Sequence, residues 1–269
     1  MKSANLGATG ALGFRHKRVQ RVRRLLAQPS YRRAEGAFVV EGAKLVAEAL
    51  RSGAPVEGVY AAPEGMADPV VGAARAAGVR VFPLGPGVIE RVTDTVTAQP
   101  VLAVAGRGDR PLDEAKDAPL VVVCVDVRDP GNLGTVLRTA EAAGVGAVIC
   151  CEGTVDVYNP KSVRASAGSI FHVRLVAGGE PVDVLEQLGA WGMRRLGTAA
   201  SHGEPYHEVD FRRPTALVLG NEAHGLEGHA AAGGVDGWVT VPMVGRSESL
   251  NVGMAAAVLC FEAARQRSS

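Results

Sequence analysis

The chain has 269 residues, of which 47% are hydrophobic and 21% charged, so it can form one large domain or two of ordinary size. No apolar run approaches the roughly 20 residues that span a bilayer, and the N-terminus lacks an apolar segment of signal-peptide type. Only 4% of the residues are aromatic, so ligand recognition must depend on backbone, charge and polar groups more than on stacking. We expect a globular protein and exclude a membrane-spanning one.

The cysteines and histidines give no metal-binding pattern. All four cysteines lie in apolar runs: Cys124, Cys150, Cys151 and Cys260. Buried, reduced thiols are therefore the expected state, which predicts a cytoplasmic location. A redox pair formed by the two adjacent cysteines is the weaker alternative. None of the six histidines has a carboxylate or cysteine partner at ligand spacing, so no metal is predicted.

The N-terminal segment is strongly basic although the net charge is only +1. No acidic residue precedes Glu35, and residues 15–28 have the spacing of an amphipathic helix with arginines on one face. A solvated basic helix is one interpretation, and a phosphate-binding patch for nucleic acid is the favoured one. The arginines predicted to bind RNA here are Arg15, Arg18, Arg21 and Arg24.

Short α/β elements follow, separated by glycine and proline. We predict a small α/β module within residues 1–105, and then a charged, aperiodic linker over residues 106–118. The predicted elements of the module are a strand at 38–40, a helix at 42–51, a strand at 56–62, a helix at 68–77, a strand at 79–84, a short helix from residue 88 and a closing strand up to residue 105.

A second region, residues 119–269, starts with the apolar run PLVVVCVDV, which is typical of a central parallel strand buried on both faces. The alternation of strands and helices predicts a doubly wound α/β sheet. Strands are expected at 119–127, 147–151, 171–176, 194–199, 215–220 and 238–243, and helices from about 132, at 182–192 and at 250–265.

Three loops in this region carry polar side chains that packing does not require. They follow apolar strands, and the carboxyl ends of parallel strands are where α/β proteins place their chemistry. The loops are DPGNLGTVLRTA with Asn132 and Arg138, GNEAHGL with Glu222, and GRSESLNVG with Ser249 and Asn251. Each loop alone could be a helix cap or a tight turn. Their occurrence in one sheet predicts one composite site.

The order of these motifs resembles the SpoU–TrmH family of RNA ribose methyltransferases. The resemblance covers the last 150 or so residues, and residues 157–173 look like a further family segment. The N-terminal part, with FVVEGAKLVAEAL, more loosely resembles the substrate-binding domain of many members. One departure is Gly253, where relatives more often carry Ala or Ser, and we expect it to loosen the last helix slightly.

The resemblance implies an α/β fold with a deep trefoil knot in its C-terminal parallel-sheet domain, and a small N-terminal α/β RNA-binding domain. It also implies a homodimer and bound S-adenosylmethionine, contacted largely by backbone. By motif position, the cofactor-binding residues would be Thr198, Gly220, Val241, Met243, Ser249 and Leu250. The reaction would transfer a methyl group to a ribose 2′-hydroxyl.

The resemblance also assigns the catalytic set, namely Asn132, Arg138, Glu222, Ser249 and Asn251. A ribose hydroxyl is a poor nucleophile, and an arginine hardly ever deprotonates in proteins. Our hypothesis is therefore that Arg138 holds the ribose or its phosphate and stabilises negative charge, aided by Asn132. Arg164 would bind phosphate of the RNA, either in the site of its own subunit or in that of the partner subunit. His224 is a weaker candidate for contact with RNA.

Several functions remain open at this stage. The N-terminal module and basic segment favour large-subunit (23S) ribosomal RNA, because recognition of RNA loops usually needs an added reader. The alternatives are a tRNA 2′-O-methyltransferase, a base methyltransferase of a related knotted family, and a non-catalytic RNA-binding protein of the same fold. The modified nucleotide, and a housekeeping or an antibiotic-resistance role, are not determined by the sequence.

Overall fold

The computed structural model describes residues 10–93 and 98–268. The chain forms two compact units, which consist of Met1–Gly108 with Tyr158–Arg164 and of Asp109–Val157 with Ala165–Ser269. The short returning segment belongs to the first unit through an aromatic pair and an ion pair. The rings of Tyr158 and Phe38 lie 4.6 Å apart, and Arg164 Nη1 lies 2.8 Å from the buried carboxylate of Glu41. The domain limits predicted from the sequence instead placed residues 158–164 in the second domain, 119–269.

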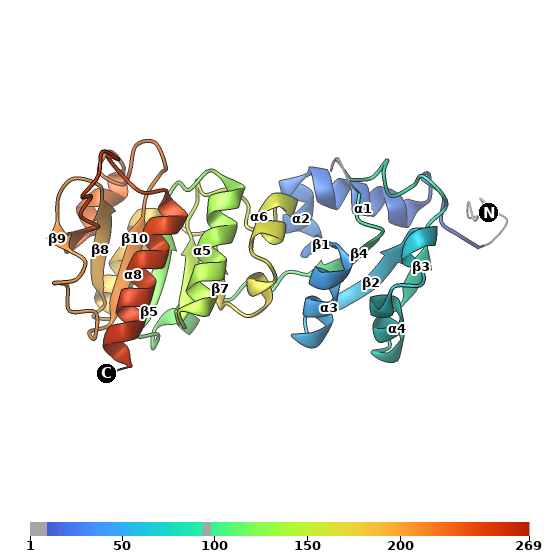
Figure 1. The fold of residues 1–269 in the computed structure, drawn as a ribbon, viewed down its shortest axis with the longest axis horizontal. Helices are drawn as coiled ribbons and strands as arrows, with labels where there is room; N and C mark the ends of the chain where they lie inside the picture. Colours follow the sequence, from blue (N-terminus) through green and yellow to red (C-terminus); the bar gives the residue numbers. More distant parts are fainter. Residues whose placement is uncertain (1–9, 94–97, 269) are drawn as a thin grey trace. The chain divides into compact units, whose positions relative to one another are not determined.

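The first unit is built on a four-stranded sheet in the order β1-β4-β2-β3 (Figure 1). Strand β4 is antiparallel to both of its neighbours, and β3 is parallel to β2. The strands are β1 Ala37–Glu41, β2 Val56–Ala61, β3 Val81–Pro83 and β4 Val101–Gly106. The helices are α1 Lys17–Ala27, α2 Pro29–Glu35, α3 Ala43–Arg51 and α4 Pro69–Ala76, with a 3-10 turn, η1, at Pro63–Gly65.

The side chains of β1 alternate between the two faces of this sheet. Ala37 and Val39 pack in one cluster with Val19, Val22 and Leu25, which are the buried residues of α1. Helices α3 and α4 pack against each other and against the strands, and their buried residues lie outside this cluster. Figure 1 shows them across the sheet from α1. The predicted amphipathic helix is thus confirmed, with its arginines on the solvent side.

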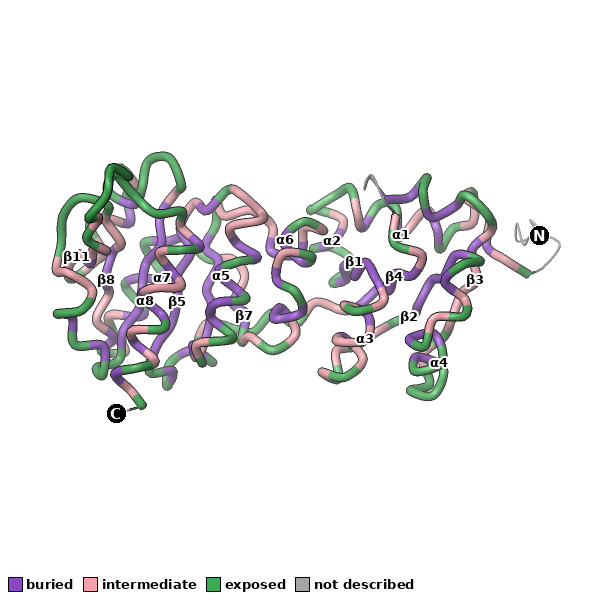
Figure 2. The backbone as a smooth tube through the Cα atoms, viewed as in Figure 1, coloured by how far each residue is buried: buried purple, intermediate pink, exposed green. Residues whose placement is uncertain are grey.

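The second unit contains seven strands that pair only in parallel, in the order β7-β6-β5-β10-β8-β11-β9. The central strands are buried along their whole length, and Figure 2 shows them in purple. The predicted parallel α/β sheet is confirmed. The strands are β5 Leu120–Cys124, β6 Ala147–Cys150, β7 Leu175–Ala177, β8 Arg194–Ala199, β9 Glu204–Pro205, β10 Thr215–Leu219 and β11 Gly237–Thr240.

Helices cover both faces of the parallel sheet. Helices α5 and α8 pack against each other on the near face in Figure 1. Helix α7 packs on a core formed by the odd-numbered residues of β5 and β6, such as Val121, Val123 and Ile149. The helices of this unit are α5 Pro130–Ala142, α7 Pro181–Ala190 and α8 Val252–Arg267, with 3-10 turns η2 Leu112–Ala115, η3 Ser169–Phe171 and η4 Ala230–Gly234. Helix α6, Pro160–Ala165, lies in the segment that returns to the first unit, except for its last residue.

Three predicted elements differ from the structure. The strand expected at 171–176 is a 3-10 turn followed by the short β7. The expected linker contains η2, whose Ala115 is buried in the core of the second unit. Where a helix was expected from residue 88, residues 88–92 form turns. Residues 94–97 of that segment lie outside the described part of the chain.

Gly253 allows α8 to approach α5 closely. A Cβ atom added at this buried glycine would lie 2.8 Å from Cγ2 of Thr135 on α5, which is closer than van der Waals contact. The glycine therefore serves close helix packing, and the loosening of α8 expected from the sequence stays a prediction. Ala256, another small residue of α8, is buried as well, and α8 packs against α5 of the same chain.

All four cysteines are free and buried. Burial raises the pKa of Cys151 and of Cys260 to about 12, which keeps both thiols protonated at neutral pH. Within residues 10–93 and 98–268, no helix is long and apolar enough to cross a membrane. The same described residues contain no group of three His, Cys, Asp or Glu side chains placed to hold a metal ion.

Candidate active site

The candidate site lies where the strand order of the parallel sheet reverses. Strands β6 and β7 lie on one side of β5, in chain order. Strands β10, β8 and β11 lie on its other side. Ligands of open α/β sheets bind at the carboxyl ends of the strands at such a switch point. The loops after β5 and β10 are therefore neighbours, although about 95 residues separate them in the sequence.

Glu222, in the loop after β10, holds the loop after β5. Its carboxylate accepts hydrogen bonds from the backbone N–H groups of Arg128 and Asp129, at 3.1 and 3.0 Å. It also accepts one from Nδ2 of Asn132, at 3.0 Å. Asp129 in turn caps α5, because its Oδ1 accepts from the N–H of Asn132 at 2.8 Å. The carboxylate thus fixes the start of α5.

Asn132 connects this carboxylate to the start of α8. A carboxylate only accepts, so the Asn132 amide must turn its NH₂ group toward Glu222 and its oxygen away. That oxygen accepts from Nδ2 of Asn251 at 2.8 Å. Oδ1 of Asn251 caps α8 by accepting from the N–H of Gly253 at 3.0 Å. Each link defines the orientation of the next, and Asn132 keeps one N–H and one lone pair for a ligand.

Asn221 shapes the loop that carries Glu222. Its Nδ2 donates to the backbone oxygen and to Oδ2 of Asp126, at 3.0 and 3.2 Å, and its Oδ1 accepts from the N–H groups of Ala223 and His224. Asp126 has φ of 56°, a left-handed conformation that Asp tolerates better than most residues. The pair therefore ties the loops after β5 and β10 together at a second point.

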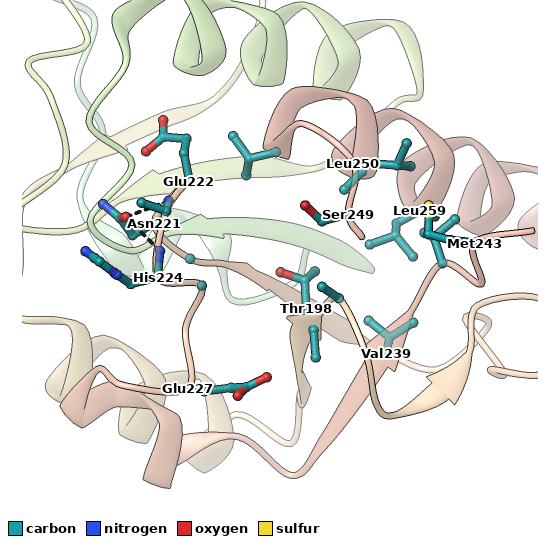
Figure 3. A pocket seen from close by; sticks show the side chains of 18 residues that line it. Thr198, Asn221, Glu222, His224, Glu227, Val239, Met243, Ser249, Leu250 and Leu259 are labelled. Atoms are coloured by element: carbon teal, nitrogen blue, oxygen red, sulfur yellow. Dashed lines mark hydrogen bonds between the residues drawn. The ribbon is translucent and has the colours of Figure 1, made fainter. Parts of the chain in front are cut away.

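A cavity of about 290 Å³ opens beside these loops. Figure 3 shows Val239, Met243, Leu250 and Leu259 gathered at one end of it and Asn221, Glu222 and His224 at the other, with Thr198 and Ser249 between them. The residues predicted to hold a cofactor all line this cavity: Thr198, Gly220, Val241, Met243, Ser249 and Leu250. A cavity with an apolar end and a polar end can bind an organic ligand that itself has apolar and polar parts.

The structure brings four of the five predicted catalytic residues together. Glu222 and Ser249 line the cavity, and Asn132 and Asn251 join Glu222 through hydrogen bonds. Arg138 lies on the exposed face of α5 and, within the described part of the chain, forms no hydrogen bond or ion pair. Its guanidinium remains available for a substrate.

The arginines predicted to bind RNA differ in their surroundings. Arg15 and Arg18 are exposed, and Arg18 stacks on Phe82, as the exposed Arg24 does on Tyr31. Arg21 instead pairs with carboxylates of Glu35 and Glu57, at 2.7 and 2.6 Å. Arg164 pairs with the buried Glu41. These two guanidinium groups already have anionic partners, whereas the other three are open to solvent.

Sequence reasoning missed Asn221 and Asp126. Asn221 lies inside the loop motif GNEAHGL, and Asp126 lies inside the apolar run PLVVVCVDV that was interpreted as a strand. Each stands two residues beyond the end of its strand, β10 or β5. Position alone could have identified them, because an Asn or Asp just past a parallel strand often bonds to its own loop. Their mutual contact depends on β5 lying next to β10, which one sequence does not reveal.

The hydrogen bonds to Glu222 predict how stability depends on pH. Burial raises the pKa of Glu222, but hydrogen bonds from Asn132, Asp129 and Arg128 lower it, with a net value below the ordinary 4.5. A depressed carboxylate pKa stabilises the fold above the unfolded-state value and loses this contribution as the pH falls through the folded value. We expect wild type to unfold at a higher temperature than Glu222→Gln at neutral pH, and the difference to shrink below pH 4.5.

Thermal unfolding of both proteins at a series of pH values measures this difference. Other carboxylates titrate equally in the two proteins and cancel. A difference that stays constant from neutral pH into the acid range would show that the Glu222 charge does not support the fold.

This geometry defines a class of protein. A parallel sheet with a cleft at its switch point is typical of α/β proteins that bind a small organic ligand or cofactor there. Residues 119–261 match the SpoU rRNA Methylase family. The chain belongs to this family, and residues 16–103 match the MRM3-like substrate binding domain. The family and the N-terminal substrate-binding domain expected from the motifs are confirmed.

Relatives and solved structures resemble most of the chain. It is 36% identical over 224 residues to the 23S rRNA (guanosine(2553)-2′-O)-methyltransferase RlmP of Bacillus subtilis, covering 83% of this chain and 87% of that protein. It is 32% identical to a 23S rRNA (uridine(2479)-2′-O)-methyltransferase of Streptomyces viridochromogenes, covering 95% and 92%. The crystal structure of the SpoU methyltransferase AviRb from Streptomyces viridochromogenes with the cofactor AdoMet matches with a TM-score of 0.85 at 30% identity, covering 95% and 99%.

Proposed function

We propose that this protein is an S-adenosylmethionine-dependent methyltransferase that methylates a ribose 2′-hydroxyl in 23S ribosomal RNA. The relatives of similar length are named for this reaction on 23S rRNA. The observation that carries the proposal is the Glu222–Asn132–Asn251 array at the rim of the cavity, in a chain of the SpoU family.

The cavity suits S-adenosylmethionine, which supplies an electrophilic methyl group when bound. We assign its binding to Thr198, Gly220, Val241, Met243, Ser249 and Leu250. A Cβ atom at Gly220 would lie 2.4 Å from backbone atoms of Gly225 and Leu226, so this position admits only glycine while the loop keeps its shape. The glycine therefore lets the loop after β10 turn tightly beside the cavity, which Gly220 and Gly225 both line.

The chain's own residues would act by orientation and by charge. A ribose hydroxyl needs its developing negative charge stabilised while it is held in line with the methyl group. Arg138 is exposed and has no partner among the described residues, and its guanidinium supplies a permanent positive charge for this purpose. Asn132, oriented by Glu222 and Asn251, offers its remaining N–H to the same oxygen. Ser249 contributes a hydroxyl at the cavity wall.

Transfer of tritiated methyl groups to purified RNA tests the proposal. The purified protein should label protein-free 23S rRNA from a strain that lacks the gene, and mapping should place the label on one ribose. Transfer RNA from the same strain is the matched alternative substrate. Label in transfer RNA alone would replace the 23S assignment, and no label in any RNA, with intact cofactor binding, would contradict the activity.

We further propose that the protein acts in the cytoplasm and as a homodimer. Four buried, free thiols fit a reducing compartment. For the dimer, the support is an apolar face on α8 and the residue before its cap. The exposed fractions are 63% for Met254, 52% for Phe261 and 37% for Leu250. Met254 and Phe261 lie seven residues apart on one helix face. The trefoil knot implied by the family stays a prediction.

Charge on that helix face should separate the subunits. The double variant Met254→Glu/Phe261→Glu is expected to elute as a monomer in size-exclusion chromatography with light scattering, while wild type elutes as a dimer. Val182→Glu, at an exposed apolar residue of α7, is the control and should stay dimeric. A monomeric wild type, or a dimeric double variant, would contradict this interface.

A further inference from the structure

Two arginine side chains converge on one aromatic ring at the start of the first unit. Phe14 precedes α1 and packs against the core cluster formed by α1 and the sheet. The Cζ atom of Arg91 lies 4.1 Å from the centre of its ring, and that of Arg23 lies 5.8 Å from it. Arg23 comes from α1 and Arg91 from the turns after β3. The ring is anchored, so both guanidinium groups have a fixed support.

These guanidinium groups are available to an outside partner. Arg23 and Arg91 are exposed, and neither forms an ion pair with a described carboxylate. Arg21, on the same helix, differs because Glu35 and Glu57 neutralise it. A guanidinium stacked on a ring keeps its N–H groups free at the edge and loses little side-chain freedom on binding. The cluster therefore presents two preorganised positive charges that no described carboxylate neutralises.

Further positive charge surrounds the Phe14 cluster. Arg15, Lys17 and Arg18 are exposed, and Arg18 lies 4.6 Å from the ring centre of Phe82, on β3. Phe82 packs against the same core cluster as Phe14, so these charges share the α1 side of the sheet. The other side carries α3 and α4. One side of this unit thus combines several cations with stacked aromatic rings, which suits a polymer of regularly spaced anions.

We propose that Arg23 and Arg91, held by Phe14, bind backbone phosphates of the RNA substrate and position it for methyl transfer. This inference rests on the proposed function, since RNA is the substrate there. RNA is favoured over an acidic protein because arginine forks match phosphate bidentately, and because residues 16–103 match a substrate binding domain. The contacts would fix orientation and carry no base specificity.

The test measures binding of protein-free 23S rRNA, from a strain that lacks the gene, at a series of salt concentrations. Each lost phosphate contact should reduce the slope of log K against log salt by about 0.7–0.9. Arg23→Gln/Arg91→Gln is expected to lower the slope by about 1.5 and to weaken binding about tenfold or more. The control Arg51→Gln/Arg75→Gln removes the same charge from the last turns of α3 and α4, and should leave the slope unchanged.

A third variant separates preorganisation from charge. Phe14→Leu keeps every positive charge but removes the ring, and should weaken binding about two- to fivefold with the slope retained. Calorimetry with S-adenosylmethionine should give wild-type values for all three variants. Each should also unfold in one cooperative thermal transition, which would establish that it is folded, although Phe14→Leu is expected to unfold at a lower temperature because Phe14 packs against the core cluster.

The outcomes distinguish this inference from the function on which it rests. If folded Arg23→Gln/Arg91→Gln binds the RNA with wild-type affinity and slope while wild type methylates it, the phosphate contacts are wrong and the function stands. If wild type neither binds nor methylates the RNA, both fail. Competition by polyglutamate as effective as competition by the RNA would identify an acidic protein as the partner and overturn the proposal.

Discussion

Gly220→Ala should lower the affinity for S-adenosylmethionine by about 10- to 100-fold, because overpacking of this kind costs about 1–3 kcal/mol. The new methyl group would lie 2.4 Å from the backbone of Gly225 and Leu226, and backbone atoms cannot rotate away as a side chain can. The loop would have to open, and Glu222 would move with it. Methyl transfer should therefore fall further than cofactor binding. Isothermal calorimetry and single-turnover methylation measure the two effects.

Gly228→Ala is the matched control for this prediction. It makes the same chemical change a few residues further along, where an added Cβ meets no atom within 4 Å. It should bind the cofactor as wild type does. If Gly220→Ala also binds normally, the loop after β10 can relax without cost, and the close approach at Gly220 is not what shapes the cavity.

Arg138→Gln should reduce kcat about 10²- to 10³-fold, the usual effect of removing one group that stabilises developing negative charge. Its affinity for S-adenosylmethionine should not change, because Arg138 does not line the cavity. Arg138→Lys should recover only part of the loss, since an ammonium group cannot reproduce the planar fork of a guanidinium. Steady-state kinetics with saturating cofactor, together with cofactor calorimetry, give both quantities.

Two results would contradict this role of Arg138. Near-full turnover by Arg138→Lys would show that fixed guanidinium geometry is not required. A parallel loss of cofactor affinity in Arg138→Gln would place the residue in the cofactor site. Arg213→Gln is the control, because it removes another exposed charge elsewhere in the second unit, and its activity should stay at the wild-type level.

Much of the local structure of the second unit was predictable because its central strands are continuous apolar runs. The positions of β5, β6 and β10 follow from that pattern, and the loops after β5 and β10 follow from the strand ends. The order of the strands does not. Asn132 and Asn251 are 119 residues apart in sequence yet share a hydrogen bond, and only the packing of α8 against α5 brings them together.

For the first unit, the sequence predicted the exposed basic helix but not which of its arginines form ion pairs. The run of basic residues before Glu35 predicted an exposed cationic helix, and α1 confirms it. Which arginines stay open depends on acids far along the chain, such as Glu57 beside Arg21 and Glu41 beside Arg164. The importance of Phe14 was likewise hidden, because Arg91 reaches it from a segment 77 residues away. Pairing across elements is a property of the fold and leaves no local pattern.

The lack of a side chain at Gly253 restricts which residues can replace Thr135 during evolution. Since a methyl group there would occupy the space of Thr135 Cγ2, a chain that acquires alanine at 253 must become smaller at 135 or accept a wider gap between α8 and α5. A wider gap stretches the Asn251–Asn132 hydrogen bond, whose donor and acceptor are now 2.8 Å apart. Homologues with alanine at the first position should therefore carry serine or alanine at the second, so that the two sites evolve as one unit.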